Sequence, residues 1–269
     1  SHIADIRDLD KLQSEMARAK PEIVIHMAAQ PLVRLSYLEP VLTYATNVMG
    51  TVNVLEAARK CSHVKAIITV TTDKCYENKE WLRGYKENDR LGGHDPYSSS
   101  KACAELVTAA YRKSFLEHQG IAVATARAGN VIGGGDWATD RLVPDILKAF
   151  EQNKVVQIRN PLSIRPWQHV FDPLHGYLLV AAAILSKHHI ANAYNFGPNH
   201  ANLMKVHEVA LRSKEIWNSE IQINYLEQES KVREARNLGL NSDLAEADLS
   251  WNNSLSIDQT LTLAIEWEK

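Results

Sequence analysis

Three short apolar runs mark the first half of the chain, at Ile23 to Met27, Ala66 to Val70 and Ala122 to Ala126. Each is a few residues long and bounded by polar residues, which is typical of a buried strand in a parallel sheet. The third run is the most weakly patterned of the three. The sequence therefore predicts at least three parallel strands.

Between these runs the apolar spacing changes from continuous to every three or four residues, which indicates helices packed on a sheet. One such stripe, starting at Asn47, consists of Val48, Val52, Leu55 and Ala58. A second helix is predicted from Ser98 to Phe115, and its small-residue face consists of Ala102, Leu106, Ala109 and Ala110. Because strands and helices alternate, we expect an α/β fold with a doubly wound parallel sheet.

After Asn130 the pattern changes to a glycine-rich turn at Gly133-Gly-Gly135, followed by shorter elements. We expect helices at 143–151, 176–185, 206–217 and 257–267, and an extended stretch over 155–170. This change predicts two units: a sheet domain over 1–132, and a smaller α/β lobe that makes up most of 133–269. Part of 171–200 is expected to return to the first domain.

Composition and charge narrow the classes of function. The 269 residues are 45% hydrophobic and carry a formal charge of -2 without a basic stripe or a run of membrane-spanning length, so neither nucleic acid nor a membrane is an expected partner. Three cysteines without a CxxC spacing, and no signal segment, indicate a reducing cytoplasm and no disulfide framework. The scattered histidines, including the pair His188-His189, predict no metal site.

The strongest chemical signal is the pair Tyr97 and Lys101. Asp95 is a good helix cap and Pro96 suits a first helical position, so the tyrosine and the lysine fall on one helix face. We expect the ammonium to lower the phenol pKa, as a base that removes a hydroxyl proton requires. Tyr-x-x-x-Lys also arises by chance, but the strand at Ala66 ends directly at Thr71-Thr-Asp-Lys74, where open α/β sheets place their ligands.

A glycine-rich turn after a first strand, which would bind a dinucleotide pyrophosphate, is missing before Ile23. The glycines at 133–135 lie too far downstream to replace it, and Ser1 to Asp8 resembles the end of a later strand. We therefore expect residues 1–269 to be a truncated form that binds a dinucleotide weakly and whose activity is doubtful.

Several longer strings are more specific than Tyr-x-x-x-Lys. They are His26-Met-Ala-Ala-Gln-Pro-Leu-Val-Arg34, Tyr44-Ala-Thr-Asn-Val-Met-Gly-Thr51, Thr72-Asp-Lys-Cys-Tyr76, Asp95-Pro-Tyr-Ser-Ser-Ser-Lys101, Arg127-Ala-Gly-Asn-Val-Ile-Gly-Gly-Gly-Asp-Trp137, Ile164-Arg-Pro-Trp-Gln-His-Val170 and Asn195-Phe-Gly-Pro198. The chain resembles the extended short-chain dehydrogenase/reductase superfamily, with its Rossmann-like fold, over nearly its whole length. Within it, the lysine at position 74 resembles the CDP-glucose 4,6-dehydratases, because the dTDP-glucose enzymes have glutamate there.

The resemblance implies an NAD-dependent lyase that converts CDP-glucose to CDP-4-keto-6-deoxyglucose, for deoxysugar and O-antigen synthesis. It implies that Tyr97 is the base at the sugar 4-hydroxyl, with Lys101 beside it, and that Thr72 donates to the 4-keto oxygen. Asp73 is then the acid at the 6-hydroxyl, and Lys74, or a water it orients, the base at C5. Two alternatives stay open for Lys74, electrostatic stabilisation of the enolate and a simple ion pair with Asp73.

Binding positions follow from the same resemblance. Those next to NAD are Asp5, Ile6, His26, Ala28, Ala29, Gln30, Asn47, Thr71, Tyr97 and Lys101. Those next to the sugar nucleotide are Val33, Asn130, Arg141, Arg165 and Arg233. The competing interpretations are packing for Ala28 and Ala29, a helix cap for Asn47, and solvated surface groups for the arginines.

More than one oligomeric state and more than one function agree with the sequence. The small-residue face of the predicted helix Ser98 to Phe115, together with the resemblance, predicts a homodimer or homotetramer. One alternative function is an epimerase or dehydratase acting on another nucleotide sugar. The other is a fragment that binds a sugar nucleotide without NAD and has no activity.

Overall fold

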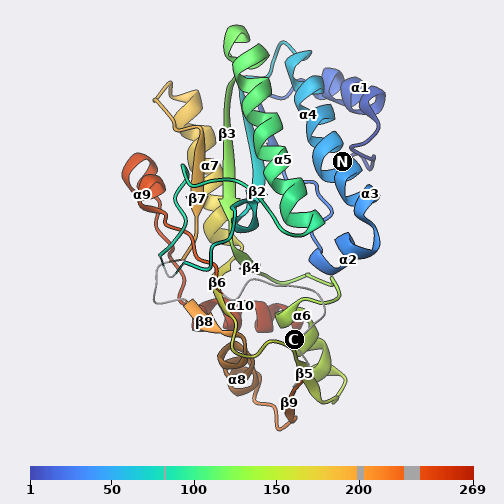
Figure 1. The fold of residues 1–269 in the computed structure, drawn as a ribbon, viewed down its shortest axis with the longest axis vertical. Coiled ribbons are helices and arrows are strands. Elements are labelled where there is room, and N and C mark those ends of the chain that lie inside the picture. Colours follow the sequence, from blue (N-terminus) through green and yellow to red (C-terminus); the bar gives the residue numbers. More distant parts are fainter. Residues whose placement is uncertain (82, 199–202, 227–236) are drawn as a thin grey trace.

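A computed structural model of the chain describes residues 1–81, 83–198, 203–226 and 237–269. Its main sheet is parallel, with the strand order β1-β2-β3-β7 (Figure 1). These strands are β1 (Ile23–His26), β2 (Ala66–Thr72), β3 (Ala122–Ala128) and β7 (Ala193–Phe196). The three predicted strands are confirmed, and β2 and β3 each continue two residues further than predicted. Thr71 and Thr72 therefore lie at the carboxyl end of the sheet itself.

Helices cover both faces of this sheet. Those of the sheet unit are α1 (Leu9–Ala19), α2 (Val33–Leu38), α3 (Pro40–Tyr44), α4 (Gly50–Arg59), α5 (Pro96–Tyr111), α7 (Phe171–Leu185) and α9 (Asp243–Leu249). Short 3-10 and π segments adjoin them: η1 (Ala45–Met49), η2 (Asp73–Cys75), η3 (Arg112–Leu116) and η4 (Glu117–Gln119).

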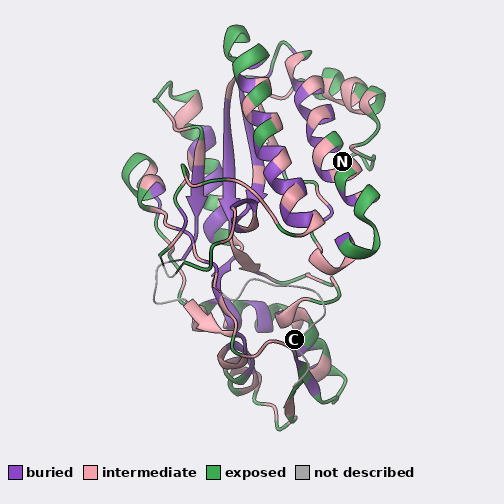
Figure 2. Ribbon diagram, in the orientation of Figure 1, coloured by how far each residue is buried: buried purple, intermediate pink, exposed green. Residues whose placement is uncertain are grey.

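The alternation of side chains along β2 explains the layers. Ile67 packs with Leu55 and Ala58 of α4 on one face, whereas its neighbour Ile68 packs with Val180 of α7 on the other. Figure 2 shows β2 and β3 buried along their length, as expected of central parallel strands. On the second face, a Cβ added to Gly176 would lie 2.3 Å from the Phe196 ring, so the close approach of α7 to β7 requires glycine.

The second unit is smaller and lies below the sheet in Figure 1. Its elements are β4 (Asn130–Ile132), α6 (Leu142–Glu151), β5 (Val156–Ile158), β6 (Ile164–His169), β8 (Leu203–Lys205), α8 (Val206–Trp217), β9 (Ile223–Tyr225) and α10 (Ile257–Glu268). The strands form two small sheets, β4-β6-β8 and β5-β9. Ile146 of α6, Val209 of α8 and Leu261 of α10 are fully buried in its core.

The chain crosses between the units more than once. After β6 it returns through α7 to β7, which pairs with β3, and α9 also packs against α7 and β7. Position within the sequence therefore does not separate the units cleanly, because the segment that completes the main sheet follows the first strands of the smaller unit.

Two local predictions are wrong. Residues 1–8 form no strand; Ile6 instead packs against Gly50, and Asn53 donates to the Ile6 carbonyl at 3.0 Å. Asn47 does not begin a helix, because it lies in η1, inside a helical segment that starts at Pro40. The helix α1, capped by Asp8, was not predicted, although Leu9, Leu12 and Met16 follow a helical spacing; none of its residues is completely buried.

Candidate active site

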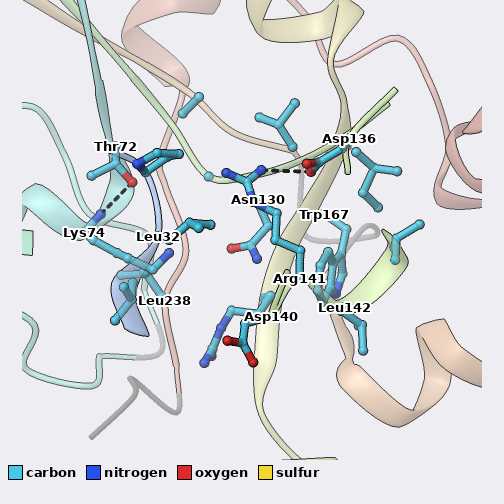
Figure 3. A pocket seen from close by; sticks show the side chains of 18 of the residues that line it. Leu32, Thr72, Lys74, Asn130, Asp136, Asp140, Arg141, Leu142, Trp167 and Leu238 are labelled. Atoms are coloured by element: carbon cyan, nitrogen blue, oxygen red, sulfur yellow. Dashed lines mark hydrogen bonds and ion pairs between the residues drawn. The ribbon is translucent and has the colours of Figure 1, made fainter. Parts of the chain in front are cut away.

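A cavity of about 560 Å³ lies where the two units meet, at the carboxyl ends of the sheet strands. Thr72 and Lys74 line one side of it, and Asp136 and Trp167 of the smaller unit line the other (Figure 3). Ligands of doubly wound sheets bind at this end of the strands because the loops there surround a crevice. The position agrees with the site expected from Thr71 to Lys74.

Tyr97 lies in the first turn of α5, as predicted. Asp95 caps α5 by accepting a hydrogen bond from the Ser98 amide at 2.9 Å, and Pro96 occupies the first turn. The Tyr97 residue is 8% exposed, and its hydroxyl lies next to Thr72 at the cavity. Burial raises the Tyr97 pKa above its ordinary value; the charge of Asp73 adds to the rise, and the hydrogen bond with Thr72 opposes it.

Lys101 lies one helical turn further on, but its ammonium donates to the Val70 carbonyl at 3.2 Å. Burial lowers the Lys101 pKa from 10.5 to about 8, and the negative charge of Glu105 opposes this decrease. The expectation that Lys101 lowers the Tyr97 pKa is therefore wrong for the described side chains. Burial is the larger effect, and the ammonium is directed to the sheet.

The Thr72-Asp73-Lys74 turn is a short 3-10 segment at the end of β2. The Thr72 hydroxyl donates to Asp73 Oδ1 at 2.9 Å, and Lys74 Nζ forms an ion pair with the same oxygen at 3.3 Å. Asp73 is fully buried, and its Oδ2 accepts no hydrogen bond from a described residue. The ion pair that was one interpretation of Lys74 is thus present, and it leaves one carboxylate oxygen available.

A second hollow borders Ala28 and Ala29 after β1, together with Asp5 and Ile6. Asp5 pairs with Arg7 on the exposed surface, which lowers the Asp5 pKa to about 2. His26 lies deeper, with Nε2 3.0 Å from the Thr51 hydroxyl, and burial lowers its pKa to about 4. These five positions, predicted near one ligand, lie along the same edge of the molecule.

Three other predicted positions already have protein partners. Asn47 exchanges hydrogen bonds with the Gln30 backbone at 2.7 and 3.0 Å and donates to Ser100 of α5 at 2.8 Å. The Gln30 side chain bonds Leu32 and Thr43, and Thr71 donates to Glu105. The Asn47 side chain therefore joins the loop after β1 to α5 by hydrogen bonds. The interpretation of Asn47 as a helix cap is wrong.

Four of the predicted sugar-nucleotide positions line the cavity: Val33, Asn130, Arg141 and Arg165. Asn130 Oδ1 is buried and accepts no hydrogen bond from a described residue, which leaves it available to a ligand. Arg141 pairs with Asp136 at 3.0 Å, and Arg165 is 7% exposed and donates to its neighbour's carbonyl. Arg233 lies outside the described residues.

The sequence did not reveal some polar groups at or below the cavity. At its mouth, Asp140 bridges Arg159 at 2.6 Å and Arg34 at 3.9 Å, so it links the two units. Below it, Glu105 and Arg127 form a buried ion pair. The spacing of four from Lys101 to Glu105, and an arginine inside the alanine-rich strand β3, were the signals that could have identified this pair.

Two further sequence expectations concern metals and membranes. No group of three or more His, Cys, Asp or Glu residues in the described ranges is arranged to hold a metal ion. Over the same ranges, no helix has both the length and the apolar character needed to cross a membrane.

Comparison with known proteins agrees with this geometry. The family model for GDP-mannose 4,6 dehydratase matches residues 1–263. CDP-glucose 4,6-dehydratase of Salmonella typhimurium is 48% identical over 100% of this chain and 76% of its own length. A UDP-glucose 4-epimerase of Thermotoga maritima superposes with a TM-score of 0.87 at 21% identity, over 99% of this chain and 83% of that one. A dTDP-glucose 4,6-dehydratase of Bacillus anthracis, solved with NAD, gives 0.79 at 24% identity, over 98% and 77%.

The two solved structures share the fold of this chain. The family model and the Salmonella relative also assign the chain to a family. Both match the chain across the sheet unit and the smaller unit, including the cavity between them. The chain belongs to the GDP-mannose 4,6-dehydratase family of nucleotide-sugar dehydratases and is a homologue of CDP-glucose 4,6-dehydratase.

Proposed function

We propose that this protein converts CDP-glucose to CDP-4-keto-6-deoxyglucose, with NAD as cofactor. The observation that carries the proposal is that Tyr97, Thr72 and the Asp73–Lys74 pair line or border one cavity in a chain 48% identical to a CDP-glucose 4,6-dehydratase. An epimerase at C4 needs only the tyrosine and a rotating ketone. The acid and base pair therefore favours dehydration.

The residues present fit the ribose-bearing parts of NAD, although residues 1–269 include no glycine-rich turn for its pyrophosphate before Ile23. Ala28 and Ala29 leave space beside Asp5 and Ile6, and the buried Lys101 ammonium donates to one acceptor among the described residues, which leaves donors for ribose hydroxyls. Asp5, Ile6, Ala28, Ala29 and Lys101 would hold the cofactor, with His26, Gln30, Asn47 and Thr71 supporting them from behind. NAD held there would supply the hydride acceptor for the sugar and the hydride for its later reduction.

The first step belongs to Tyr97 and Thr72. Tyr97 takes the proton of the sugar 4-hydroxyl, and Thr72 Oγ1 donates to the oxygen that becomes the ketone. Since burial disfavours the phenolate, positive charge must lie near Tyr97 when it acts. Lys101 can supply it if its ammonium turns from the Val70 carbonyl toward the cavity.

Dehydration belongs to Asp73 and Lys74. If the proton that joins them moves from Lys74 to Asp73, the lysine becomes a neutral amine and the aspartate a neutral acid. The amine then removes the C5 proton, while the acid protonates the departing 6-hydroxyl, and water leaves. The step ends with an ammonium and a carboxylate, so the ion pair of the structure is regenerated.

The nucleotide end is assigned to the smaller unit. Asn130, Arg141 and Arg165 line the cavity there, and arginine binds a diphosphate through its planar fork. Val33 would contact the sugar from the sheet unit. As part of this proposal the division lies near residue 129, between β3 and β4, rather than at 132, and 171–196 and α9 belong to the sheet unit.

Assembly and location complete the proposal. A homodimer or homotetramer through α5 is supported by Leu106, which is 60% exposed, and by the exposed Ala110. Ala102 packs inside the chain with Cys75 and Tyr76, so it does not contribute to such an interface. A cytoplasmic enzyme of deoxysugar synthesis is consistent with the free cysteines Cys61, Cys75 and Cys103.

The test compares CDP-glucose with UDP-glucose, dTDP-glucose and GDP-mannose in deuterated water, with products identified by mass spectrometry and NMR. We expect a product from CDP-glucose that has lost one water and carries deuterium at C5. A C4 epimer of unchanged mass would refute the dehydratase assignment. Equal rates with all four substrates would refute the cytidine preference.

A further inference from the structure

A buried ion pair lies beneath the cavity, between α5 and β3. Arg127 Nη2 and Glu105 Oε2 are 2.8 Å apart, Arg127 Nε and Glu105 Oε1 2.9 Å, and the side chains are 5% and 3% exposed. Removing two charges from water costs more than such a pair commonly returns, so apolar residues could give equal stability here. The position of the pair therefore calls for another explanation.

Glu105 connects the helix of Tyr97 and Lys101 to the strand ends. It lies one turn beyond Lys101 and two beyond Tyr97, hence on the same helix face. Its carboxylate accepts hydrogen bonds from Thr71 of β2 and, at 2.7 Å, from Thr125 of β3. Through Thr71 it reaches the strand that continues directly into Thr72 and Asp73.

Arg127 connects its ion pair with Glu105 to the loop that follows Lys74. Its Nη1 donates to the Tyr76 hydroxyl at 2.7 Å and to the Glu87 carbonyl at 2.9 Å. Tyr76 in turn stacks on Tyr85 at 5.1 Å, and Tyr85 on Trp81 at 5.3 Å. The loop from Tyr76 to Asp95 joins the two catalytic segments, so Arg127 anchors it at its start and in its middle.

We infer that Glu105 and Arg127 are positioning residues, which hold the Tyr97–Lys101 helix in register with the Thr72-Asp73-Lys74 turn, and that the Glu105 carboxylate keeps Lys101 protonated. The inference rests on the proposed function for its catalytic meaning. Two of its consequences can be measured without turnover. They are the protonation of Lys101 and the protection of the loop from hydrogen exchange.

The surroundings of Lys101 support the electrostatic part. The described titratable groups that act on it, or that it acts on, are Glu105 from α5, Cys75 from η2 and His26 from β1. Burial raises the Cys75 pKa and lowers that of His26 to about 4, so both are neutral near pH 7. Within this set, Glu105 supplies the opposite charge that favours the ammonium.

The first experiment titrates Lys101 by NMR in protein labelled with 13C at the lysine ε carbons, with the signal assigned from Lys101→Arg. In Glu105→Gln, we expect the Lys101 pKa to fall by about one unit, as the loss of a nearby opposite charge predicts. Two controls keep this charge: Thr125→Val removes a hydrogen bond to Glu105, and Asp258→Asn breaks an ion pair with Arg212 in the smaller unit. Neither should shift the titration.

Glu105→Gln leaves Arg127 buried without a countercharge, which can prevent folding. The double variant Glu105→Gln/Arg127→Met removes both charges; because the loss of the like charge of Arg127 offsets part of the effect, the Lys101 pKa should fall by less than in Glu105→Gln. If Lys101 titrates as in the parent protein in either variant, the electrostatic part of the inference is refuted.

The second experiment measures amide hydrogen exchange in Arg127→Lys, which keeps the charge but loses the fork that bonds Tyr76 and Glu87. We expect exchange in residues 73–95 to rise by up to about tenfold, with α8 and α10 unchanged. An increase spread evenly over the chain, or none in 73–95, would refute the positioning role. Absence of CDP-glucose turnover by the parent protein would instead refute the proposed function and leave both measurements standing.

Discussion

Replacing Lys101 by methionine should stabilise the protein at neutral pH while removing its activity. In the folded chain, burial lowers the Lys101 pKa from 10.5 to about 8, whereas the unfolded chain keeps the ordinary value. Between these two values the unfolded state binds a proton that the folded state does not. The free energy of unfolding of the parent therefore rises with pH across this window, and below about pH 8 the folded state carries the full penalty.

The size of the penalty follows from the difference between the two pKa values. A decrease from 10.5 to about 8 corresponds to about 3 kcal/mol, and the side chain is buried, so solvent screening is weak. Methionine has a similar length and no charge, which removes the penalty. Loss of the hydrogen bond to the Val70 carbonyl offsets about 1 kcal/mol. We expect a net gain of about 2 kcal/mol at pH 7, most of which disappears near pH 10.

Urea unfolding followed by circular dichroism, at pH 7 and at about pH 10, measures this gain for parent and variant. Lys113→Met is the matched control, because Lys113 follows α5 but is exposed; it should show no gain that depends on pH. The reasoning is refuted if Lys101→Met is less stable than the parent at pH 7. It is also refuted if the difference in unfolding free energy is the same at both pH values.

The remaining predictions concern the reaction and the assembly. Tyr97→Phe should slow the first oxidation by about 10²- to 10⁴-fold in a rapid-mixing assay of reduced cofactor, whereas Tyr194→Phe, which removes a hydroxyl bonded to Asp248 away from the cavity, should not. Asp73→Asn and Lys74→Ala should still oxidise the sugar but stall before dehydration, so reduced cofactor accumulates; full turnover by both would contradict their roles. Sedimentation should show a dimer or larger assembly that Leu106→Glu dissociates, and a parent monomer at micromolar concentration would count against it.

Sequence patterns predicted the elements whose signals are local. The β2 run and the Asp95-Pro96 start of α5 were found because burial periodicity and helix capping are encoded in neighbouring residues. Because ligands of open α/β sheets bind at the carboxyl ends of the strands, the sequence also predicted that Thr72 and Lys74 lie at the cavity. Helix α1 has the same kind of local signal, with Leu9, Leu12 and Met16 at helical spacing after the Asp8 cap, and could have been predicted from it.

Contacts between distant segments could not be predicted in this way. Asn47 looked like a helix cap, yet its side chain ties Gln30 to Ser100, which lie far apart in sequence. Glu105 and Arg127 are 22 residues apart, and only the packing of α5 against β3 brings them together. A polar residue within an apolar pattern indicates that a partner exists, but the fold identifies the partner.

Tyr97 and Lys101 show why the spacing of a motif does not determine its ionisation. The helix puts both on one face as predicted, but burial disfavours the charged form of each, so the phenol pKa rises and the ammonium pKa falls. Such a pair is not a ready base. It becomes one when Lys101 keeps its proton and positive charge reaches the phenol. Glu105 beneath Lys101 favours the first condition, and Arg141 at the cavity wall contributes to the second. The reactivity of the motif therefore depends on residues outside it, which is where mutations can separate its geometry from its charge.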